Sequence, residues 1–250
     1  MKKIKVNAVV FDYGNTIVHD PFQDILKLKA VDFQKTFEKS GYNIGRKEII
    51  EKWNEANENV NYIHISHFAQ EEPIIEEALE NLGIKHLDVS SLSKELLSIY
   101  RDGYKQIYSS DQRRNEIQST LKSLKEKGKK LAVFSNGRSS DVRMAMKLYK
   151  VFNLFDFIIA SEEIGTEKPS SLVFDFILKK IGESPQNVLY VGDDPIRDVQ
   201  ASKQKGMKAV LYIPPKKYRK STPWRKYDDK VFEKPDAIIT KFSQLSKIIE

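Results

Sequence analysis

Short apolar runs alternate with helical stretches along most of this chain, and this alternation restricts the possible fold more than any other feature. Six runs have the length and the β-branched or aromatic content of buried strands. These runs are Ala8–Phe11, Lys130–Ser135, Phe157–Ala160, Asn187–Gly192, Ala209–Ile213 and Ala237–Thr240. Strands that alternate with helices predict a mostly parallel sheet with right-handed crossovers. The expected fold class is therefore α/β.

Four helical stretches interrupt this alternation after the first strand. Apolar residues recur at helical spacing in residues 22–37, 46–62, 72–82 and 91–107. Nothing between Pro21 and about Ser109 has a clear strand pattern. We therefore expect an all-helical insert at residues 19–109 and a core formed by residues 1–18 and 110–250. A chain of 250 residues is long enough for both.

The composition indicates where the protein works. With no cysteine, the chain has neither a disulfide frame nor a thiolate metal site, which fits a reducing compartment. The first apolar stretch is interrupted at Asp12, too early for the core of a signal peptide, and no stretch is long enough to span a bilayer. We expect a soluble, cytoplasmic protein with no membrane partner.

The net charge of +7 is concentrated in one segment. Residues 214–235 hold eight Lys or Arg against three Asp or Glu, which gives this segment +5 of the total. Aromatic residues lie between its bases, a combination that nucleic-acid-binding segments use. An exposed loop of solvated charges is the favoured interpretation, so nucleic acid binding is not expected. Attraction of anionic substrates is a third interpretation.

Polar side chains stand at the ends of the predicted strands or just before a helix. They are Asp12 after the first strand, Ser135 and Asn136 after the second, Asp193 and Asp194 after the fourth, and Lys168 before a helix. In a parallel sheet such ends share one edge, so these groups can meet in one crevice. Carboxylates can hold Mg²⁺, and a lysine with a hydroxyl can bind a phosphoryl group. One carboxylate is then left as a nucleophile. Alternatively, Asp12 only caps a turn.

Four short motifs resemble those of one known group, the haloacid dehalogenase superfamily of aspartyl-phosphate phosphatases and their relatives. In order they are Phe11–Thr16 (FDYGNT), Phe134–Gly137 (FSNG), Glu167–Pro169 (EKP) and Gly192–Asp198 (GDDPIRD). Each is weak alone, but all four occur in order on the expected strand-turn context. The resemblance covers nearly the whole chain. It implies a Rossmann-like parallel sheet core with an inserted all-helical cap domain that closes over the substrate.

The resemblance also implies a role for each site residue. Asp12 would attack phosphorus and carry the phosphoryl group, and Thr16 would brace the turn around it. Mg²⁺ would be held by Asp12, the main-chain carbonyl of Gly14 and Asp193, with Asp198 orienting this shell. The phosphoryl oxygens would be bound by Ser135, Asn136 and Lys168. Asp194 would be either an outer-shell group or a helix cap.

Gly14 departs from the pattern of most phosphatases in this superfamily. Those proteins have a second aspartate there, which protonates the leaving oxygen and later activates water, a role worth about 10²–10⁴-fold in rate. Glycine cannot perform it, so we expect modest Mg²⁺-dependent phosphatase activity on a small phosphorylated metabolite. A catalytically weak protein that binds a phosphorylated ligand is one alternative. A 2-haloacid dehalogenase is another, although Asp193 and Asp198 argue against it.

Several side chains in or near the insert have open roles. A proton donor that replaces the missing aspartate could be His19 or one of His64 and His67, which otherwise belong to a plain cap surface. Tyr13, Trp53 and Tyr62 line the pocket or belong to the core of the cap. Dimer formation through the helical insert is also left open.

Overall fold

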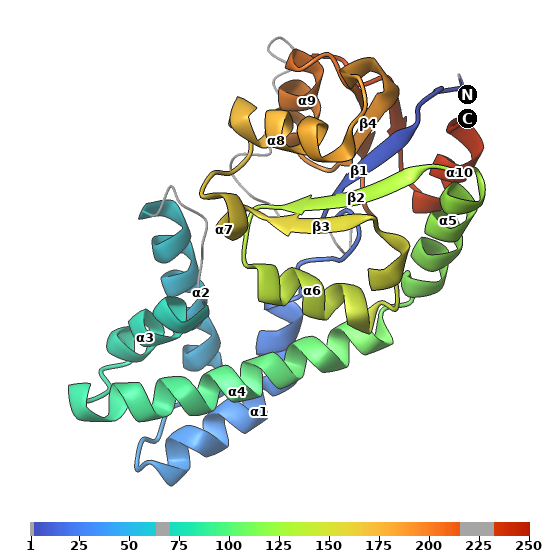
Figure 1. Cartoon of the computed structure of the whole chain (residues 1–250). Coiled ribbons are helices and arrows are strands. Elements are labelled where there is room, and N and C mark those ends of the chain that lie inside the picture. Colours follow the sequence, from blue (N-terminus) through green and yellow to red (C-terminus); the bar gives the residue numbers. More distant parts are fainter. Residues whose placement is uncertain (1–2, 64–70, 216–232) are drawn as a thin grey trace. The chain divides into compact units, whose positions relative to one another are not determined.

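The computed structural model describes residues 3–63, 71–215 and 233–250. The chain divides into two compact units, and each is described here by itself. The α/β unit comprises residues 1–20 and 111–250, and the helical unit comprises Pro21–Ser110. Both are visible in the ribbon (Figure 1). No helix in the described part of the chain is long and apolar enough to cross a membrane.

The α/β unit is built on one six-stranded sheet in which all strands are parallel. The spatial order is β3-β2-β1-β4-β5-β6, so the first strand lies in the middle. The strands are β1 (Ala8–Asp12), β2 (Lys130–Ser135), β3 (Phe157–Ala160), β4 (Val188–Gly192), β5 (Lys208–Tyr212) and β6 (Ala237–Ile239). All six predicted strands are present, and the α/β fold with a parallel sheet is confirmed. The order changes direction at β1 and β4, which is where open α/β sheets bind ligands.

Helices cover both faces of the sheet (Figure 1). One face packs on α8 (Ser171–Ile181) and α9 (Ala201–Gln204), with Val10, Phe174 and Tyr190 in a shared buried cluster. The other face packs on α5 (Arg114–Glu126), α6 (Ser139–Leu148) and α10 (Leu245–Ile248). Phe11 of β1 meets Phe242 on that side, with ring centroids 5.7 Å apart. Successive residues of β1 thus serve opposite faces, and Asp12 follows Val10 toward α8.

Apolar residues at helical spacing in residues 196–205 predict a single helix there, and the segment after β4 differs from this prediction. It begins with a π-helical segment, η3 (Pro195–Gln200), and only then continues as α9. A wider helical turn often marks a functional site. Here it accompanies the inward placement of Asp198, which is only 1% exposed. The structure also contains short turns that the sequence pattern did not indicate: η1 (Phe152–Leu154), α7 (Ser161–Ile164) and η2 (Pro185–Asn187).

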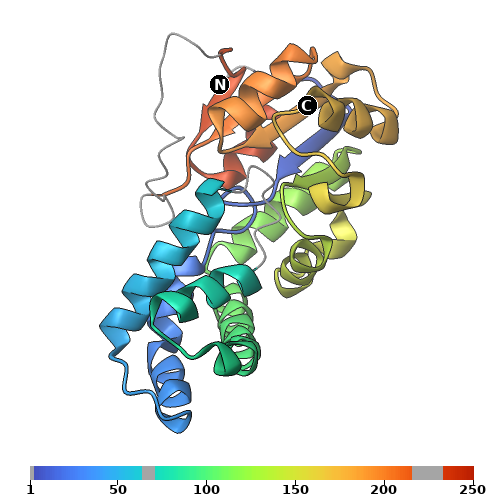
Figure 2. The ribbon, with the colours of Figure 1, turned by 90° about the vertical axis from the view of Figure 1, so that its left-hand side faces the viewer.

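Within its described residues, the helical unit has four packed helices with a core of their own (Figure 2). They are α1 (Phe22–Lys39), α2 (Arg46–Ile63), α3 (Glu71–Asn81) and α4 (His86–Ser110). Trp53 is buried there between Phe33 and Tyr100, with centroids 4.6 Å and 5.9 Å away. Of the two interpretations of Trp53, the structure supports the cap core. The expected helical insert is confirmed for the residues that the structure describes.

A buried polar cluster in the α/β unit holds together the two points where the chain leaves and re-enters that unit. Asp111 accepts hydrogen bonds from the Tyr149 hydroxyl, from Arg113 N at 2.9 Å and from Arg113 Nη2 at 3.3 Å. His19 Nδ1 lies 3.3 Å from Asp111 Oδ2. His19 is separated from the insert by one residue, Asp20, and Asp111 follows the insert directly, so this pair fixes the two chain ends close together.

Candidate active site

Asp12 is the last residue of β1, and its carboxylate is held from two sides. Thr16 Oγ1 donates to Asp12 Oδ2 at 3.2 Å, and Lys168 Nζ donates to Asp12 Oδ1 at 2.6 Å. The turn that follows Asp12 is closed by hydrogen bonds from Ile17 N and Val18 N to Tyr13 O. Asp12 is 9% exposed, so it is nearly enclosed but reachable. The sequence-predicted residues Asp12, Thr16 and Lys168 are thus in direct contact.

Lys168 links two carboxylates through one ammonium group. Its Nζ lies 2.6 Å from Asp12 Oδ1 and 2.6 Å from Asp198 Oδ1, and the side chain is only 3% exposed. Burial opposes the charge, but the Asp12 and Asp198 carboxylates outweigh it and hold the pKa of Lys168 well above its usual range. The ammonium also lies 5.3 Å from the centroid of the Tyr190 ring. Lys168 is therefore a fixed positive charge beside Asp12.

Asn136 fixes the backbone that carries Lys168. Its Nδ2 donates to Lys168 O at 2.9 Å, and its Oδ1 accepts from Lys168 N at 2.9 Å. The loop after β2 is thereby tied to the loop before α8. Ser135, the last residue of β2, is 3% exposed, and the nearby Gly137 N donates to Ser161 Oγ at 3.0 Å. Asn136 thus holds the backbone of Lys168 in place, and Ser135 lies at the carboxyl end of β2.

Asp198 reaches the same place from η3. Its Oδ1 accepts from Lys168, and its Oδ2 accepts from Asp194 N at 3.0 Å. Gly192 makes this position available, because a Cβ there would lie 2.2 Å from Asp198 Oδ2 and 2.5 Å from Asp198 Cβ. Burial raises the pKa of Asp198 to about 6, opposed by Lys168 and reinforced by Asp12 and Asp194.

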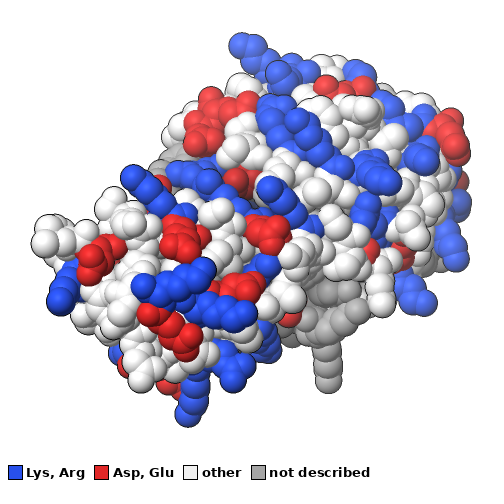
Figure 3. Space-filling model, turned by 90° about the horizontal axis from the view of Figure 1, so that it is seen from below, with Lys and Arg blue, Asp and Glu red and all other residues white. Residues whose placement is uncertain are grey.

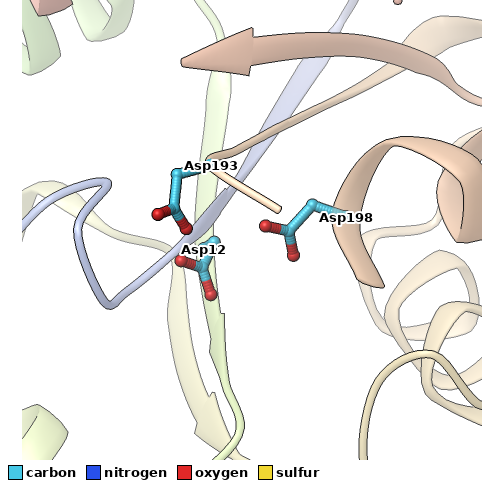
Figure 4. Close-up of side chains that lie close together, drawn as sticks. All are labelled: Asp12, Asp193 and Asp198. Atoms are coloured by element: carbon cyan, nitrogen blue, oxygen red, sulfur yellow. The ribbon is translucent and has the colours of Figure 1, made fainter. Parts of the chain in front are cut away.

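Three carboxylates converge at this edge of the sheet (Figure 4). Oxygen atoms of Asp12, Asp193 and Asp198 all lie within 4.8 Å of one another, and all three residues are buried. Such oxygen donors suit a hard divalent cation such as Mg²⁺. The formal charge of the site also favours a bound cation. The three carboxylates and Asp194 carry four negative charges, and Lys168 and Arg197 carry two positive charges, so these six residues have a net formal charge of −2.

Asp194 caps the helical segment that follows it. Its Oδ1 accepts from Ile196 N at 2.9 Å and from Arg197 N at 2.8 Å, and its Oδ2 accepts from Arg197 Nε at 3.0 Å. Burial alone would raise the pKa of Asp194, but Arg197 and the two backbone amides lower it. Of the two roles considered for Asp194, the structure shows the helix cap.

The remaining sequence candidates lie elsewhere or outside the described residues. The His19 ring contacts Asp111 through its Nδ1 atom. Both His64 and His67 lie outside the described residues, as does most of the basic segment at 214–235, and nothing is described of the Tyr62 side chain. On the face seen in Figure 3, basic and acidic side chains are interspersed.

Sequence reasoning missed three residues that support the site. Tyr190 lies under the Lys168 ammonium, Gly192 gives Asp198 its space, and Arg197 pairs with Asp194. A weak signal existed for two of them. Glycine at the end of a buried strand often marks a close approach, and a basic residue three positions after an aspartate can pair with it on a helix. Nothing in the sequence pattern distinguishes Tyr190 from an ordinary core residue.

Comparison with known proteins finds several relatives named as phosphatases. A phosphoglycolate phosphatase from Pseudomonas putida is 30% identical over 129 residues, 51% of this chain and 47% of the relative. A putative pyrophosphatase, PpaX, from Caldanaerobacter subterraneus is 28% identical over 254 residues, 99% of this chain and 96% of the relative. For a second phosphoglycolate phosphatase, from Aquifex aeolicus, the match covers 61% of the relative. The chain thus spans only about half of the two phosphoglycolate phosphatases, 47% of one and 61% of the other.

Solved structures with the same fold are more distant in sequence. A 2-haloacid dehalogenase from Pseudomonas syringae pv. Tomato superposes with a TM-score of 0.65 at 22% identity, over 99% of this chain and 98% of that one. The putative hydrolase YfnB from Bacillus subtilis gives 0.65 at 17% identity, over 99% of both chains. At this identity the likeness shows the fold alone. The family described as haloacid dehalogenase-like hydrolase matches residues 9–212, so the resemblance seen in the motifs is confirmed and the chain belongs to this family of hydrolases.

Proposed function

We propose that this protein is a Mg²⁺-dependent phosphatase that hydrolyses a small phosphorylated metabolite through an aspartyl-phosphate on Asp12. One observation carries the proposal: Lys168 Nζ lies 2.6 Å from both Asp12 and Asp198, within a group of carboxylates that includes Asp193. A nucleophilic carboxylate, a fixed cation and an oxygen-rich cation site in one buried cluster suit the transfer of a doubly charged phosphoryl group.

Asp12, Asp193 and the main-chain carbonyl of Gly14 are the residues that would hold Mg²⁺, with Asp198 beside them. The fit rests on the three clustered carboxylates and on their excess of negative charge. When bound, the ion supplies neutralisation of phosphoryl charge. The hydrogen bonds from Thr16 and Lys168 hold the Asp12 carboxylate in position for attack.

The phosphoryl oxygens would meet Ser135 and Lys168 at the carboxyl edge of the sheet. Lys168 offsets the charge that develops on those oxygens, and the Asn136 bonds keep its backbone in place. Asn136 therefore acts on phosphate through Lys168.

Three further expectations stay predictions. The first is a catalytic core at residues 1–18 and 110–250 with a cap at 19–109 that selects the substrate. The others are a cytoplasmic location and a homodimer.

Relatives give the first substrates to test. Their names include phosphoglycolate phosphatase, glyceraldehyde 3-phosphate phosphatase and putative pyrophosphatase. We would measure phosphate release from these substrates and a panel of sugar phosphates, with Mg²⁺ and with a chelator. Turnover should require Mg²⁺ and should be lost in Asp12→Asn, in which the nucleophile is replaced by a neutral group of the same shape.

Four results would contradict this function. Turnover that persists without a divalent cation would remove Mg²⁺ from the mechanism, and turnover that persists in Asp12→Asn would remove Asp12. Halide release from 2-haloacids would favour a dehalogenase, although carboxylates at Asp193 and Asp198 give this site a metal-binding character. Tight binding of a phosphorylated ligand without any turnover would favour a binding protein.

A further inference from the structure

Two residues on one face of β4 lie next to the ion pair between Lys168 and Asp198. Tyr190 and Gly192 are two positions apart, so both belong to the same face of the sheet. The Lys168 ammonium lies 5.3 Å from the centroid of the Tyr190 ring, and a Cβ at Gly192 would collide with Asp198. This face of β4 therefore places a large ring against Lys168 and leaves space for Asp198.

The Tyr190 ring is held rigidly by its surroundings. The backbone of Tyr190 pairs with Val10 of β1 and with Ala209 of β5, in the middle of the sheet. Its ring packs against the Phe174 ring of α8, with centroids 5.5 Å apart and the ring planes inclined by 61°. Only 1% of the residue is exposed. Because a close-packed interior resists displacement, Tyr190 gives a fixed surface to the groups that lie on it.

The contact with Lys168 belongs to the ring of Tyr190 and not to its hydroxyl. The hydroxyl oxygen is buried and makes no hydrogen bond within the described residues. A cation over an aromatic face is attracted by the electrons of the ring, and the attraction is stronger where water is excluded. The Lys168 side chain is only 3% exposed, so water screens this attraction little. A phenylalanine ring would offer the same face.

The ring differs from the other contacts of Lys168 because its attraction does not change during phosphoryl transfer. The ammonium is held at 2.6 Å by Asp12 and at 2.6 Å by Asp198. When an Asp12 oxygen bonds to phosphorus, the bond from phosphorus to the leaving oxygen breaks and its electron pair goes to that oxygen. Asp12 changes from an anion to a neutral acyl group. One of the two charges that hold Lys168 is then lost, and Asp198 alone pulls the ammonium away from the phosphoryl group.

On the basis of the proposed function, we propose that Tyr190 is a positioning residue for phosphoryl transfer. Its ring keeps the Lys168 ammonium beside Asp12 while the charge of Asp12 is lost. Lys168 then stays where it can offset the charge that develops on the phosphoryl oxygens. Tyr190 acts through Lys168 and is not itself a reacting group.

The kinetic test replaces the ring in the full-length protein and uses p-nitrophenyl phosphate with Mg²⁺. Tyr190→Leu should lower kcat by about 10–10²-fold, because a misplacement of about 1 Å costs up to about 10²-fold. Both kcat and kcat/KM should fall by the same factor, since the ring matters once the charge of Asp12 is lost. Tyr190→Phe, the conservative replacement, should restore most of both values because it retains the face of the ring.

Phe242→Leu is the matched control for the loss of a buried ring. Phe242 is 1% exposed and packs on the other face of the sheet, against Phe11 and Tyr212. This variant should lose thermal stability as Tyr190→Leu does, without the fall in kcat. If Tyr190→Leu does not fold, Tyr190→Met takes its place, because methionine is flexible enough to fill the space and has no ring.

A spectroscopic measurement tests the contact without relying on activity. In protein whose lysines carry ¹³C at Cε, the ring current of Tyr190 should shift the Lys168 signal, which Lys168→Arg identifies by removing it. Tyr190→Phe and Phe242→Leu should retain this shift, and Tyr190→Leu should abolish it.

The possible failures are distinguishable. Equal losses of kcat in Tyr190→Leu and Phe242→Leu would overturn the inference, because any buried ring would then have the same effect. A Tyr190→Phe variant as slow as Tyr190→Leu would also overturn it, as would a Lys168 signal that does not respond to Tyr190→Leu. A wild-type protein without Mg²⁺-dependent turnover of any substrate tested would instead reject the proposed function, and the Lys168 signal would still decide whether the ring holds the ammonium.

Discussion

The lack of space at Gly192 leads to a prediction at the scale of one residue. A Cβ there would lie 2.2–2.5 Å from the Oδ2, Cγ and Cβ atoms of Asp198, so the Asp198 side chain must move away from Lys168. We expect Gly192→Ala to lower kcat by at least about tenfold, since positioning errors of about 1 Å cost up to about 10²-fold. Gly45→Ala is the matched control, because a Cβ at Gly45 meets nothing within 4 Å. Equal activity of both variants would contradict this account of Asp198.

Lys168 provides a residue-scale prediction about stability as well as activity. Lys168→Met would leave Asp12 and Asp198 as neighbouring buried carboxylates without their shared cation. Breaking a buried pair costs about 3–5 kcal/mol, which urea unfolding would measure at pH 7. Activity should be lost at the same time.

A second buried lysine serves as the control for Lys168. Lys29 of the helical unit bonds to Asp102, whose side chain is 52% exposed and can be hydrated when left alone. Lys29→Met should therefore cost less free energy of unfolding than Lys168→Met. The reverse order would mean that the ion pairs at Lys168 do not hold the site together.

At the scale of elements, the sequence predicted the strands well and the connections less well. Bounds of β2 and β3 are as expected, because apolar runs that end in polar turn residues are unambiguous. The pattern at η3 predicts an ordinary helix and is wrong there, since hydrophobic periodicity does not show that Asp198 turns inward. Strand ends indicate Asp12, Ser135 and Asp193 as candidate site residues. The pairing of Asn136 with the Lys168 backbone spans 32 residues and depends on tertiary structure alone.

The buried cluster around Asp111 predicts how stability depends on pH. Burial opposes its charge, but His19, Arg113 and Tyr149 together hold the pKa of Asp111 well below its usual range. A lowered pKa stabilises the fold above the ordinary value of about 3.9, and this contribution is lost as the pH falls toward the folded pKa. We expect Asp111→Asn to cost about 1.5–3 kcal/mol at pH 7 and progressively less below about pH 4.

Urea unfolding of both proteins between pH 7 and pH 3 would check this. Asp175→Asn is the control, because Asp175 pairs with Lys205 at the surface and is 55% exposed. That variant should change the free energy of unfolding by less than about 1 kcal/mol at each pH. A cost of Asp111→Asn that grows toward acid would show that the carboxylate is not stabilised by its neighbours.

At the scale of the whole molecule, the two units have separate cores, and we expect them to have separate tasks. The buried cluster of the helical unit is made only of residues within Pro21–Ser110, and the six strands all belong to the α/β unit. Asp12, Lys168, Asp193 and Asp198 lie in the α/β unit as well. The cation site should therefore not need the insert, whereas the choice of substrate is expected to depend on it.

Replacing residues 21–110 with a short Gly-Ser linker would test this separation. His19 Nδ1 and Asp111 Oδ2 lie 3.3 Å apart, so a few residues can join the cut ends with little closure entropy. The shortened protein should unfold cooperatively, and Mg²⁺ at about 100 times its Kd should stabilise it by about 2.7 kcal/mol. Calorimetry should record this as a rise in Tm of about 2–4 °C per kcal/mol. Asp193→Asn in the same background should lose most of the rise, because it removes one of three carboxylates. A shortened protein that folds but shows no effect of Mg²⁺ would mean that the cation site is not built by these carboxylates alone.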